Sequence, residues 1–174
     1  MSNVEAGTIA CVCYEDGKQF LGVAKITMPD IEHETFTVKG LGLMGSAEFP
    51  AYCQVKPMKM TINFRDANEA QYRLAEIRQH LLDLRVIKQG YENTSGELTI
   101  TDHKYIIQCQ PIKTTGGDVE PASPQGVSGE FAVTSFKEYR ANKLCRHIDV
   151  VKMIYEDGSG VDRFAKIRRM LGMN

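Results

Sequence analysis

Cysteine and histidine are the residues whose spacing in this chain comes nearest to a chemical site. Cys11 and Cys13 are separated by one residue, as are Cys145 and His147, and in an extended strand each pair would share one face. Four such ligands could in principle hold zinc, although structural zinc sites normally place their paired ligands two to four residues apart across a turn. Buried, reduced thiols are the simpler interpretation, because the cysteines number five and include no C-x-x-C pair. We expect no metal and no cofactor.

The sequence also offers no motif for nucleophilic or acid–base catalysis. It lacks G-x-S-x-G, H-E-x-x-H and paired-carboxylate patterns. Its four histidines are scattered over predicted strand and helix faces, where single histidines are more often packing or surface residues; they are His33, His80, His103 and His147. The sequence therefore predicts a protein that is not an enzyme and has no catalytic residue.

Length and composition indicate one soluble globular domain covering residues 1–174. Hydrophobic residues make up 43% of the chain and charged residues 25%, and 174 residues are enough for one good core. Lys and Arg number 21 against 22 Asp and Glu, so no global positive field indicates nucleic-acid binding. No run of 18 apolar residues is present, and the start M-S-N-V-E-A-G lacks a signal-peptide pattern. We expect a protein without a membrane anchor that is cytoplasmic when made.

The first forty residues predict antiparallel strands joined by tight turns. Asp16 and Gly17 separate T-I-A-C-V-C-Y-E from F-L-G-V-A-K-I-T-M, and both residue types tolerate the positive φ of a two-residue hairpin turn. Pro29 cannot donate to a strand ladder, so it ends the second strand. A third strand, I-E-H-E-T-F-T-V-K, has one wholly polar face that is expected to contact water; this face consists of His33, Thr35, Thr37 and Lys39.

A glycine-rich loop and a regularly alternating strand follow. The segment Gly40 to Pro50 carries three glycines and no sustained period, which predicts a loop with unusual backbone angles. The next stretch, P-M-K-M-T-I-N-F-R, alternates apolar Met58, Met60, Ile62 and Phe64 with polar residues, the pattern of a half-buried strand. We expect the apolar face of this strand to lie on the core.

A helix is predicted from Asp66 to about His80. The Asp66 carboxylate can accept an orphan backbone N–H, and Glu69, three residues on, can complete a capping box. An apolar stripe at helical spacing runs along it, formed by Ala67, Ala70, Leu74, Ile77 and Leu81. We expect this stripe to pack on the core and Glu69 to pair with Arg73 on the solvent face.

The second half of the chain predicts a long bent strand, a loop and a hairpin. Between residues 98 and 109 the apolar phase slips from even to odd positions, so a bulge is expected over Asp102 to Lys104. Gly, Pro and Ser make Thr114 to Gly126 the best candidate for a mobile loop of the kind that becomes ordered on assembly. Strands over Val127 to Tyr139 and Leu144 to Val151 meet at the turn R-A-N-K.

A short helix with complete end signals is predicted close to residue 174. Ser159 can cap its start, Asp162 suits the first turn, and Gly172 provides a left-handed stop. Helices of about eleven residues are marginal alone, so its apolar residues must dock on the chain's own sheets or on a neighbouring subunit. These apolar residues are Val161, Phe164, Ile167 and Leu171.

Three stretches of the sequence carry a family signal. They are F-L-G-V-A-K-I-T-M-P, V-K-G-L-G-L-M-G-S-A and I-D-V-V-K-M-I-Y-E-D-G-S-G-V-D-R-F-A-K-I-R-R-M-L-G. In them the chain resembles the major tail tube protein of contractile-tailed bacteriophages, and the tube of R-type bacteriocins is similar. The resemblance covers about the first fifty and the last thirty residues, and G-V-D-R with the terminal helix is its most specific part.

The resemblance implies a mainly β fold with flanking helices, a β-sandwich of the tail tube type. It implies six copies in a ring, with long hairpins closing a β-barrel around a lumen, and stacked rings that form the inner tube of a contractile tail or bacteriocin. Such a tube would be a conduit for DNA or would take part in membrane puncture. The implied partners are further copies of the chain, the tail sheath, baseplate, tail terminator and tape measure proteins, and DNA in the lumen. The implied location is the virion tail or bacteriocin particle, assembled in the bacterial host cytoplasm.

Two sets of residues become hypotheses under this resemblance. Strands with a polar face can line an aqueous channel, and a lumen rich in Lys and Arg would bind the phosphate backbone, so acidic and neutral side chains are expected there. The predicted lumen residues are Glu32, Glu34, Glu130 and Thr134. The predicted subunit contacts are Gly40, Gly42, Gly45, Val161, Asp162, Arg163 and Phe164.

Two alternatives stay open at this point. A type VI secretion-like tube protein would share the architecture but would form rings without a phage sheath. A zinc-binding β-sandwich or an enzyme is the more distant alternative, and it would depend on the Cys and His pairs. The sequence also leaves open whether the particle carries DNA or is a headless bacteriocin.

Overall fold

The computed structural model describes residues 3–22, 25–40, 42, 44–93 and 96–173. Over these residues the chain is mainly β, as predicted, with eleven strands and two short helices. The strands are β1 (Asn3–Glu15), β2 (Gln19–Phe20), β3 (Lys25–Thr27), β4 (His33–Lys39), β5 (Ser46–Val55), β6 (Met58–Asn63), β7 (His80–Glu92), β8 (Leu98–Thr115), β9 (Ser128–Arg140), β10 (Lys143–Asp149) and β11 (Ile154–Glu156). The helices are α1 (Glu69–Leu74) and α2 (Ala165–Met170).

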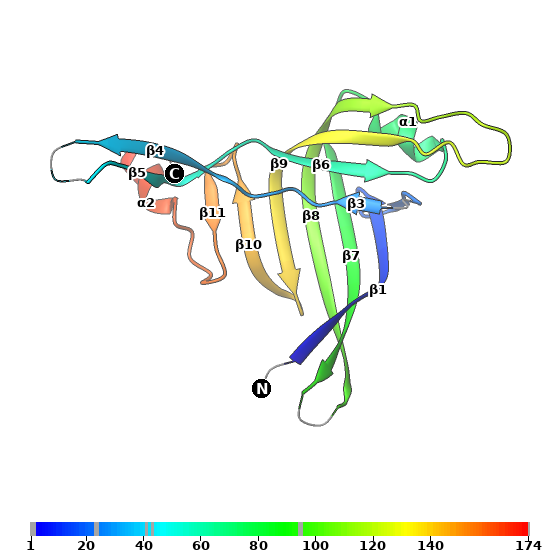
Figure 1. Ribbon diagram of the computed structural model, residues 1–174, viewed down its shortest axis with the longest axis horizontal. Coiled ribbons are helices and arrows are strands. Elements are labelled where there is room, and N and C mark those ends of the chain that lie inside the picture. Colours follow the sequence, from blue (N-terminus) through cyan, green and yellow to red (C-terminus); the bar gives the residue numbers. More distant parts are fainter. Residues whose placement is uncertain (1–2, 23–24, 41, 43, 94–95, 174) are drawn as a thin grey trace.

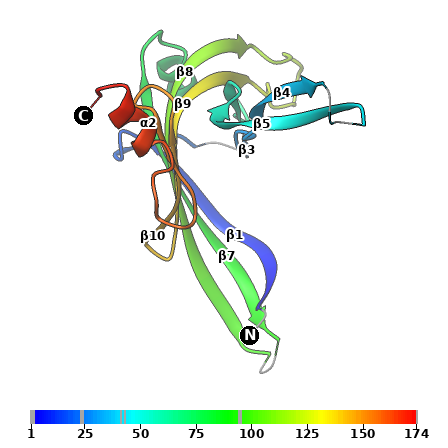
Figure 2. The same ribbon diagram turned by 90° about the vertical axis from the view of Figure 1, so that its left-hand side faces the viewer.

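Most strands belong to one branched antiparallel sheet. Its main path runs β11–β10–β9–β8–β7–β1–β2, and β6 pairs with β9 while β3 pairs with β6. β9 uses residues 128–133 for β6 and residues 135–140 for β10, so the sheet branches along this strand. Figure 1 shows β7 to β10 descending from a horizontal layer, and Figure 2 shows β1, β7 and β8 extending well below it. The molecule therefore consists of a horizontal layer and a hanging sheet, joined through β8 and β9.

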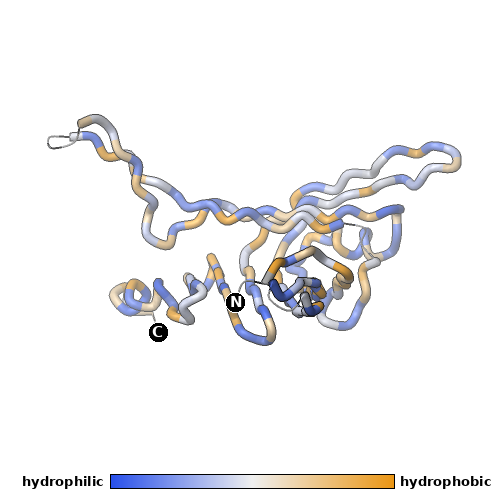
Figure 3. Tube along the Cα trace, turned by 60° about the horizontal axis from the view of Figure 1, so that its bottom comes forward, coloured by the Kyte–Doolittle hydropathy of each residue, from blue (hydrophilic) through white to orange (hydrophobic). Residues whose placement is uncertain are grey.

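The horizontal layer ends in two hairpins that point in opposite directions. We call this layer the platform; it contains β3, β6, residues 110–115 of β8 and residues 128–133 of β9. We call the β4–β5 hairpin the arm, and its strands pair only with each other among the described residues. The arm extends from one end of the platform and the loop between β8 and β9 from the other (Figures 1 and 3). Each hairpin therefore projects past the body of the molecule.

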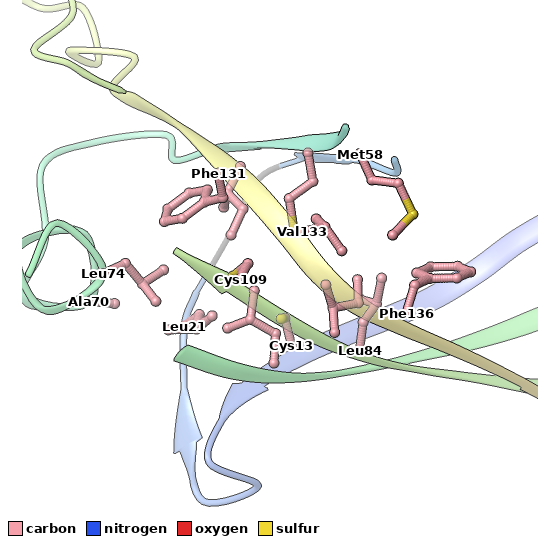
Figure 4. Close-up of a cluster of buried hydrophobic side chains, with 14 of the residues drawn as sticks. Cys13, Leu21, Met58, Ala70, Leu74, Leu84, Cys109, Phe131, Val133 and Phe136 are labelled. Atoms are coloured by element: carbon pink, nitrogen blue, oxygen red, sulfur yellow. The ribbon is translucent and has the colours of Figure 1, made fainter. Parts of the chain in front are cut away.

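The hydrophobic core lies between the platform and the hanging sheet (Figure 4). Met58, Met60 and Ile62 of β6 are at most 2% exposed, whereas Lys59 between them is exposed. The half-buried strand predicted from this alternation is confirmed. The other buried members of the core cluster are Cys13, Leu21, Phe64, Ala70, Leu74, Leu82, Leu84, Val86, Ile107, Cys109, Val127, Phe131, Val133, Phe136 and Ile148.

The helix predicted from Asp66 to His80 is wrong at both ends. α1 begins at Glu69, and its N-cap is Asn68, whose side-chain oxygen accepts a hydrogen bond from the Gln71 backbone N–H at 2.9 Å. The helix ends at Leu74 after six residues. Both Asp and Asn are good caps, so residue type alone did not select between them.

The wrong helix end has a tertiary cause. Residues 75–79 leave the helix and lead into β7, where His80 pairs with Cys109 of β8. Ile77, which was predicted to face the core, is 99% exposed. Arg73 does not pair with Glu69 but with Glu15 of β1, at 3.3 Å. The members of the predicted stripe that are buried in the core are Ala70 and Leu74.

The second predicted strand is divided. Asp16 and Gly17 have φ of +52° and +69°, so the predicted tight turn after β1 is confirmed. β2 pairs with β1 over two residues only, after which the chain turns at Gly22, whose φ is +59°. β3 then pairs with β6 rather than with β1. Nothing in the local sequence indicates this change of partner, so the alternation alone predicts one continuous strand.

The loop predicted from Gly40 to Pro50 is shorter than expected. β5 already begins at Ser46, so residues 46–50 are strand. Gly42 and Gly45 have φ of +94° and +145°, which fits the predicted unusual backbone. Leu41 and Leu43 lie outside the described residues.

β8 contains no bulge over Asp102 to Lys104, contrary to prediction. Its register with β7 is uninterrupted from Leu98 to Cys109. Register shifts occur in its pairing with β9 instead, at Gln108/Cys109 and Pro111/Lys113. The apolar phase changes because the far end of the strand extends beyond the core, where Leu98 and Ile100 are 55% and 65% exposed.

The C-terminal strands agree with their predictions. β9 and β10 begin and end within two residues of the expected bounds, and they meet at Ala141 and Asn142, whose φ of +48° and +59° form a tight turn. The predicted loop from Thr114 to Gly126 corresponds to residues 116–127 between β8 and β9. No helix in the described part of the chain is long and apolar enough to cross a membrane.

Candidate functional site

The arm has one polar and one apolar face, and both lie open. Phe36 stands opposite Phe49, and Thr37 opposite Glu48, so neighbouring pairs point to opposite sides of the hairpin. Phe36 and Phe49 are 62% and 51% exposed, and Val38 on the same face is 43% exposed. A two-stranded hairpin is marginally stable by itself in water, and this one leaves its apolar face uncovered. The arm is therefore a surface suited to a partner.

Two tyrosines attach the arm to the body. The Tyr52 hydroxyl donates to the Arg163 carbonyl oxygen at 3.3 Å, and the Tyr155 hydroxyl lies 3.3 Å from His33 Nε2. The His33 and Tyr155 rings are also in contact, with centroids 5.7 Å apart. The base of the arm is thereby held against β11 and the segment before α2.

The segment before α2 contains four predicted contact residues, and three of them bind within the chain. Phe164 is 7% exposed, and the Arg163 side chain forms a 2.9 Å ion pair with Asp157. Asp162 pairs with Arg168 at 2.6 Å. Val161 is 55% exposed and remains available to a neighbour.

The terminal helix is shorter and capped differently than predicted. α2 covers Ala165–Met170, and no side chain caps its first residue. Ser159 is not the cap; its hydroxyl donates to Asp157 instead. Gly172, with φ of +73°, follows the helix in the left-handed conformation, as predicted. Phe164, which is 7% exposed, anchors this segment on the body of the molecule, whereas Leu171 is 61% exposed and does not.

The acidic groups around α2 remain ionised to low pH. Hydrogen bonds from the Ser159 hydroxyl and backbone, and then from Arg163, lower the pKa of Asp157 to about 2. Burial tends to raise the pKa of Asp162, but hydrogen bonds from Arg168 and from the backbone outweigh it and lower that pKa. The Asp157–Arg163 and Asp162–Arg168 ion pairs within this segment therefore persist across neutral and mildly acidic pH.

Of the predicted lumen residues, Glu32 and Glu34 are exposed, and Glu130 and Thr134 are half-buried. Glu130 and Thr134 of β9 point away from the core side that Phe131 and Val133 occupy. Glu130 forms a 3.0 Å ion pair with Lys59 of β6. Glu32 and Glu34 are exposed just before and within β4, and Glu32 pairs with Lys56 at 3.1 Å. The structure thus divides these four residues between two places, β9 and the base of the arm.

The predicted contact glycines form the tip of the arm. Gly40, Gly42 and Gly45 are all exposed, and Met44 beside them is fully exposed. An exposed apolar side chain at the end of a projecting hairpin is suited to contact with another chain.

Strand edges remain open at both ends of the platform. β4 pairs with β5 on one side and has no strand on the other. β7 begins at His80, opposite Cys109, so residues 110–115 of β8 have a strand neighbour only in β9. These statements hold for the described part of the chain. Open edges invite pairing with another chain.

The thiols do not form a metal site. Within the described ranges, no three His, Cys, Asp or Glu residues come close enough together to hold a metal ion. Cys11 is exposed and Cys13 is buried. Burial is the main cause that raises the pKa of Cys13 and of Cys109 to about 12, so both remain protonated thiols.

Comparison with known proteins identifies the family. Residues 8–172 match the family described as phage tail tube protein FII. The chain belongs to this family. It is a structural tail tube protein, as the sequence resemblance predicted.

Solved structures similar to this tail tube protein come from contractile injection systems. A sheath–tube complex of the extracellular contractile injection system PVC, in its extended state, contains a chain with 13% identity and a TM-score of 0.49; the match covers 74% of this chain and 87% of that one. The anti-feeding prophage baseplate contains a chain with 9% identity and a TM-score of 0.49, over 75% of this chain and 91% of that one. No curated protein sequence matches the chain.

One buried cluster in this tail tube protein was missed at the sequence level. Glu15, at the end of β1, is 1% exposed and lies 2.7 Å from Nδ1 of His80, which is 0% exposed. Arg78 donates to the same carboxylate at 2.7 Å and Arg73 at 3.3 Å. His80 Nε2 lies 3.1 Å from the Glu76 carbonyl oxygen. No sequence signal joins these groups, because Glu15 and His80 are 65 residues apart.

Proposed function

We propose that this tail tube protein assembles as stacked six-membered rings that form the hollow inner tube of a contractile tail. The observation that carries the proposal is the pair of open strand edges at opposite ends of the platform, on β4 and on residues 110–115 of β8. If the β4 edge of one copy meets the β8 edge of the next, the sheet continues from copy to copy and closes into a barrel. Closure removes the edges that a single chain exposes.

The polar side of the platform suits the wall of an aqueous channel. We propose that Glu130 and Thr134 line the lumen together with Glu32 and Glu34 near the base of the arm. Glu130 is paired with Lys59, so these two side chains present a neutral pair rather than a free cation to a passing phosphate backbone. A wall with few unpaired cations would let DNA move without holding it.

The arm tip and the terminal segment are the proposed contacts between copies. Gly40, Gly42 and Gly45 allow the tip to approach a neighbouring backbone closely, since glycine adds no side-chain bulk. Asp162, Arg163 and Phe164 shape the terminal segment from within, and Val161 presents an apolar side chain outward. The tip glycines and Val161 would contact a neighbour directly. Asp162, Arg163 and Phe164 would position the surface that carries Val161.

The remaining roles follow from this assembly. The whole chain would act as one structural domain without catalytic activity, and its partners would be the tail sheath, baseplate, terminator and tape measure proteins. Rings would form in the bacterial host cytoplasm and end in a phage tail or a bacteriocin particle. DNA would pass through the lumen in the first case and would be absent in the second.

The first test is the assembly state of the purified protein. Sedimentation velocity across a hundredfold range of concentration is expected to show growth from monomer to rings and longer particles, because edge pairing depends on mass action. Negative-stain microscopy of the assembled fraction should show annular end views and striated rods with a central channel. A protein that remains monomeric at every concentration and shows no rings would refute the proposal.

A further inference from the structure

The two edges of the hanging sheet carry opposite charge. β11 is one edge of the strand order, and β1 with β2 is the other. Residues 143–173, which contain β10, β11 and α2, hold seven Lys and Arg against four Asp and Glu. Residues 13–20, 64–80 and 116–127, which surround α1 at the opposite edge, hold seven Asp and Glu against four Lys and Arg. The chain is nearly neutral overall, so this separation of charge is local.

The positive edge combines unpaired cations with exposed apolar side chains. We call it the cationic edge patch; its members are Lys152, Lys166, Arg169, Val151, Met170 and Leu171. Lys166 and Arg169 are exposed on α2, and neither forms an ion pair among the described residues, in contrast to Arg168, which binds Asp162. Val151, Met170 and Leu171 are 74%, 73% and 61% exposed. A hydrogen bond of 2.6 Å from Arg168 to the Met153 carbonyl oxygen holds α2 beside the 150–153 turn.

The negative edge has the complementary composition. We call it the acidic edge patch; its members are Asp16, Glu69, Asp118, Glu120, Phe20 and Tyr72. The four acids are exposed, and none forms an ion pair within the described ranges. Phe20 and Tyr72 are 60% and 68% exposed.

An ion pair and a backbone hydrogen bond join the parts of the acidic edge patch. Arg73 of α1 binds Glu15 at the end of β1, at 3.3 Å, which fixes the helix beside the turn that carries Asp16. The Gly126 backbone N–H donates to the Arg65 carbonyl oxygen at 3.1 Å, which joins the β8–β9 loop to the chain leading into α1. Figure 1 shows α1 and this loop together at one end of the molecule and α2 at the other.

We propose that the cationic edge patch of one copy docks on the acidic edge patch of the next copy. The occupant of each patch is a second molecule of the same chain, because each patch offers the charge sign that the other needs along with apolar side chains to bury. Contact between two identical patches would bring like charges together, so a two-fold dimer built on either patch alone is disfavoured. A head-to-tail contact between different patches produces rings when its rotation closes. This inference rests on the proposed ring and names the surfaces that make its lateral contact.

The test uses two charge-reversed proteins, each carrying one altered patch. Lys166→Glu with Arg169→Glu makes both patches acidic, and the triple change Glu69→Lys, Asp118→Lys and Glu120→Lys makes both patches basic. Each variant alone is expected to need about tenfold more protein for half-assembly in sedimentation velocity, because every head-to-tail contact then opposes like charges. An equimolar mixture is expected to assemble at the concentration that wild type needs, since the two variants can alternate around a ring.

Two controls make the result decisive. Lys143→Glu reverses an exposed lysine at the β9–β10 turn that forms no ion pair in the described part of the chain. This variant should assemble like wild type, whereas Arg169→Glu, which reverses one charge in the cationic edge patch, should assemble less well. Wild type should assemble less as sodium chloride rises from about 0.05 to 0.5 M, because salt screens exposed charges; this measurement needs no variant to fold.

The outcomes separate this inference from the proposed function. If wild type forms rings and both charge-reversed proteins assemble alone as well as wild type, the docking of these patches is refuted and the ring remains. The same holds if the mixture assembles no better than its components, or if wild-type assembly is insensitive to salt. If wild type forms no rings at all, the proposed function itself fails.

Discussion

Glu15→Gln is expected to lower the free energy of unfolding by about 3 kcal/mol at neutral pH. Glutamine has nearly the volume of glutamate, so the loss does not come from a cavity. It comes from the shared carboxylate, which lies 2.7 Å from His80 Nδ1 and 2.7 Å from the Arg78 guanidinium. His80 is 0% exposed and cannot turn to water once this partner is weakened. For a chain of this size the change corresponds to a melting temperature lower by about 6 to 12 °C.

The pH dependence of Glu15→Gln follows from the direction of the pKa shift. Burial tends to raise the pKa of Glu15, but hydrogen bonds from His80 and Arg73 outweigh it and lower the pKa below its ordinary value of 4.5. A carboxyl with a lowered folded pKa stabilises the protein above its unfolded pKa, and this stabilisation is lost as the pH falls through the folded value. The difference between wild type and Glu15→Gln should therefore be largest near pH 7 and should shrink below about pH 4.5.

Urea unfolding followed by circular dichroism measures both effects. Glu76→Gln is the matched control, because Glu76 also binds Arg78, at 2.9 Å, but has a side chain that is 58% exposed. That variant should change the unfolding free energy by no more than about 0.5 kcal/mol. A Glu15→Gln protein within 1 kcal/mol of wild type, or a difference independent of pH, would show that the buried cluster does not hold α1 to β1 as described.

Local alternation was enough to predict the strands that lie on the core. The apolar positions Met58, Met60 and Ile62 identified β6 and its buried face, because a strand with one face on a core has to repeat with period two. The turn at Ala141 and Asn142 was predicted from two strand-like runs that meet at R-A-N-K, where asparagine tolerates a positive φ. In both cases the deciding interaction lies within a few residues.

Long-range pairing accounts for what the sequence did not predict. The stretch around Ile77 and Leu81 has helical spacing, yet residues 75–79 leave the helix so that His80 can meet Glu15 and Cys109. Neither partner is near in sequence, so no local propensity shows this competition. The same holds for β3, which changes its partner from β1 to β6.

The candidate site was predictable from the sequence only in part. The alternation over His33–Lys39 predicted the polar face of β4, but it did not show that the opposite face, where Phe36 is 62% exposed, also lies open. Sequence period shows that a strand has an apolar side, and only the fold shows whether that side has a partner. The open edges on β4 and β8 are likewise a property of topology and are invisible in composition.

Phe36→Lys is expected to raise the concentration needed for half-assembly about thirtyfold or more, without destabilising the monomer. Phe36 lies on the exposed apolar face of the arm, opposite Phe49. Because the isolated chain leaves most of this side chain in water, its replacement should cost the monomer little stability. In a ring the part of this face around Phe36 and Phe49 would be buried, and removal of a buried aromatic anchor commonly costs 2 kcal/mol or more, about thirtyfold in affinity. Lysine adds an unpaired charge to the same position.

The neighbouring residue provides the matched control for the arm. Thr37→Lys places the same side chain on the same strand one position later, on the polar face opposite Glu48. If that face lines the lumen, the lysine stays in water and assembly should remain within threefold of wild type, although the tube wall would bind DNA more strongly at low salt. Equal loss of assembly from both variants would mean that the whole arm is buried between copies and that the polar face does not line a channel. Full assembly of both would mean that the arm makes no contact between subunits, in which case the exposed Phe36 and Phe49 would have to be covered by a different protein of the particle.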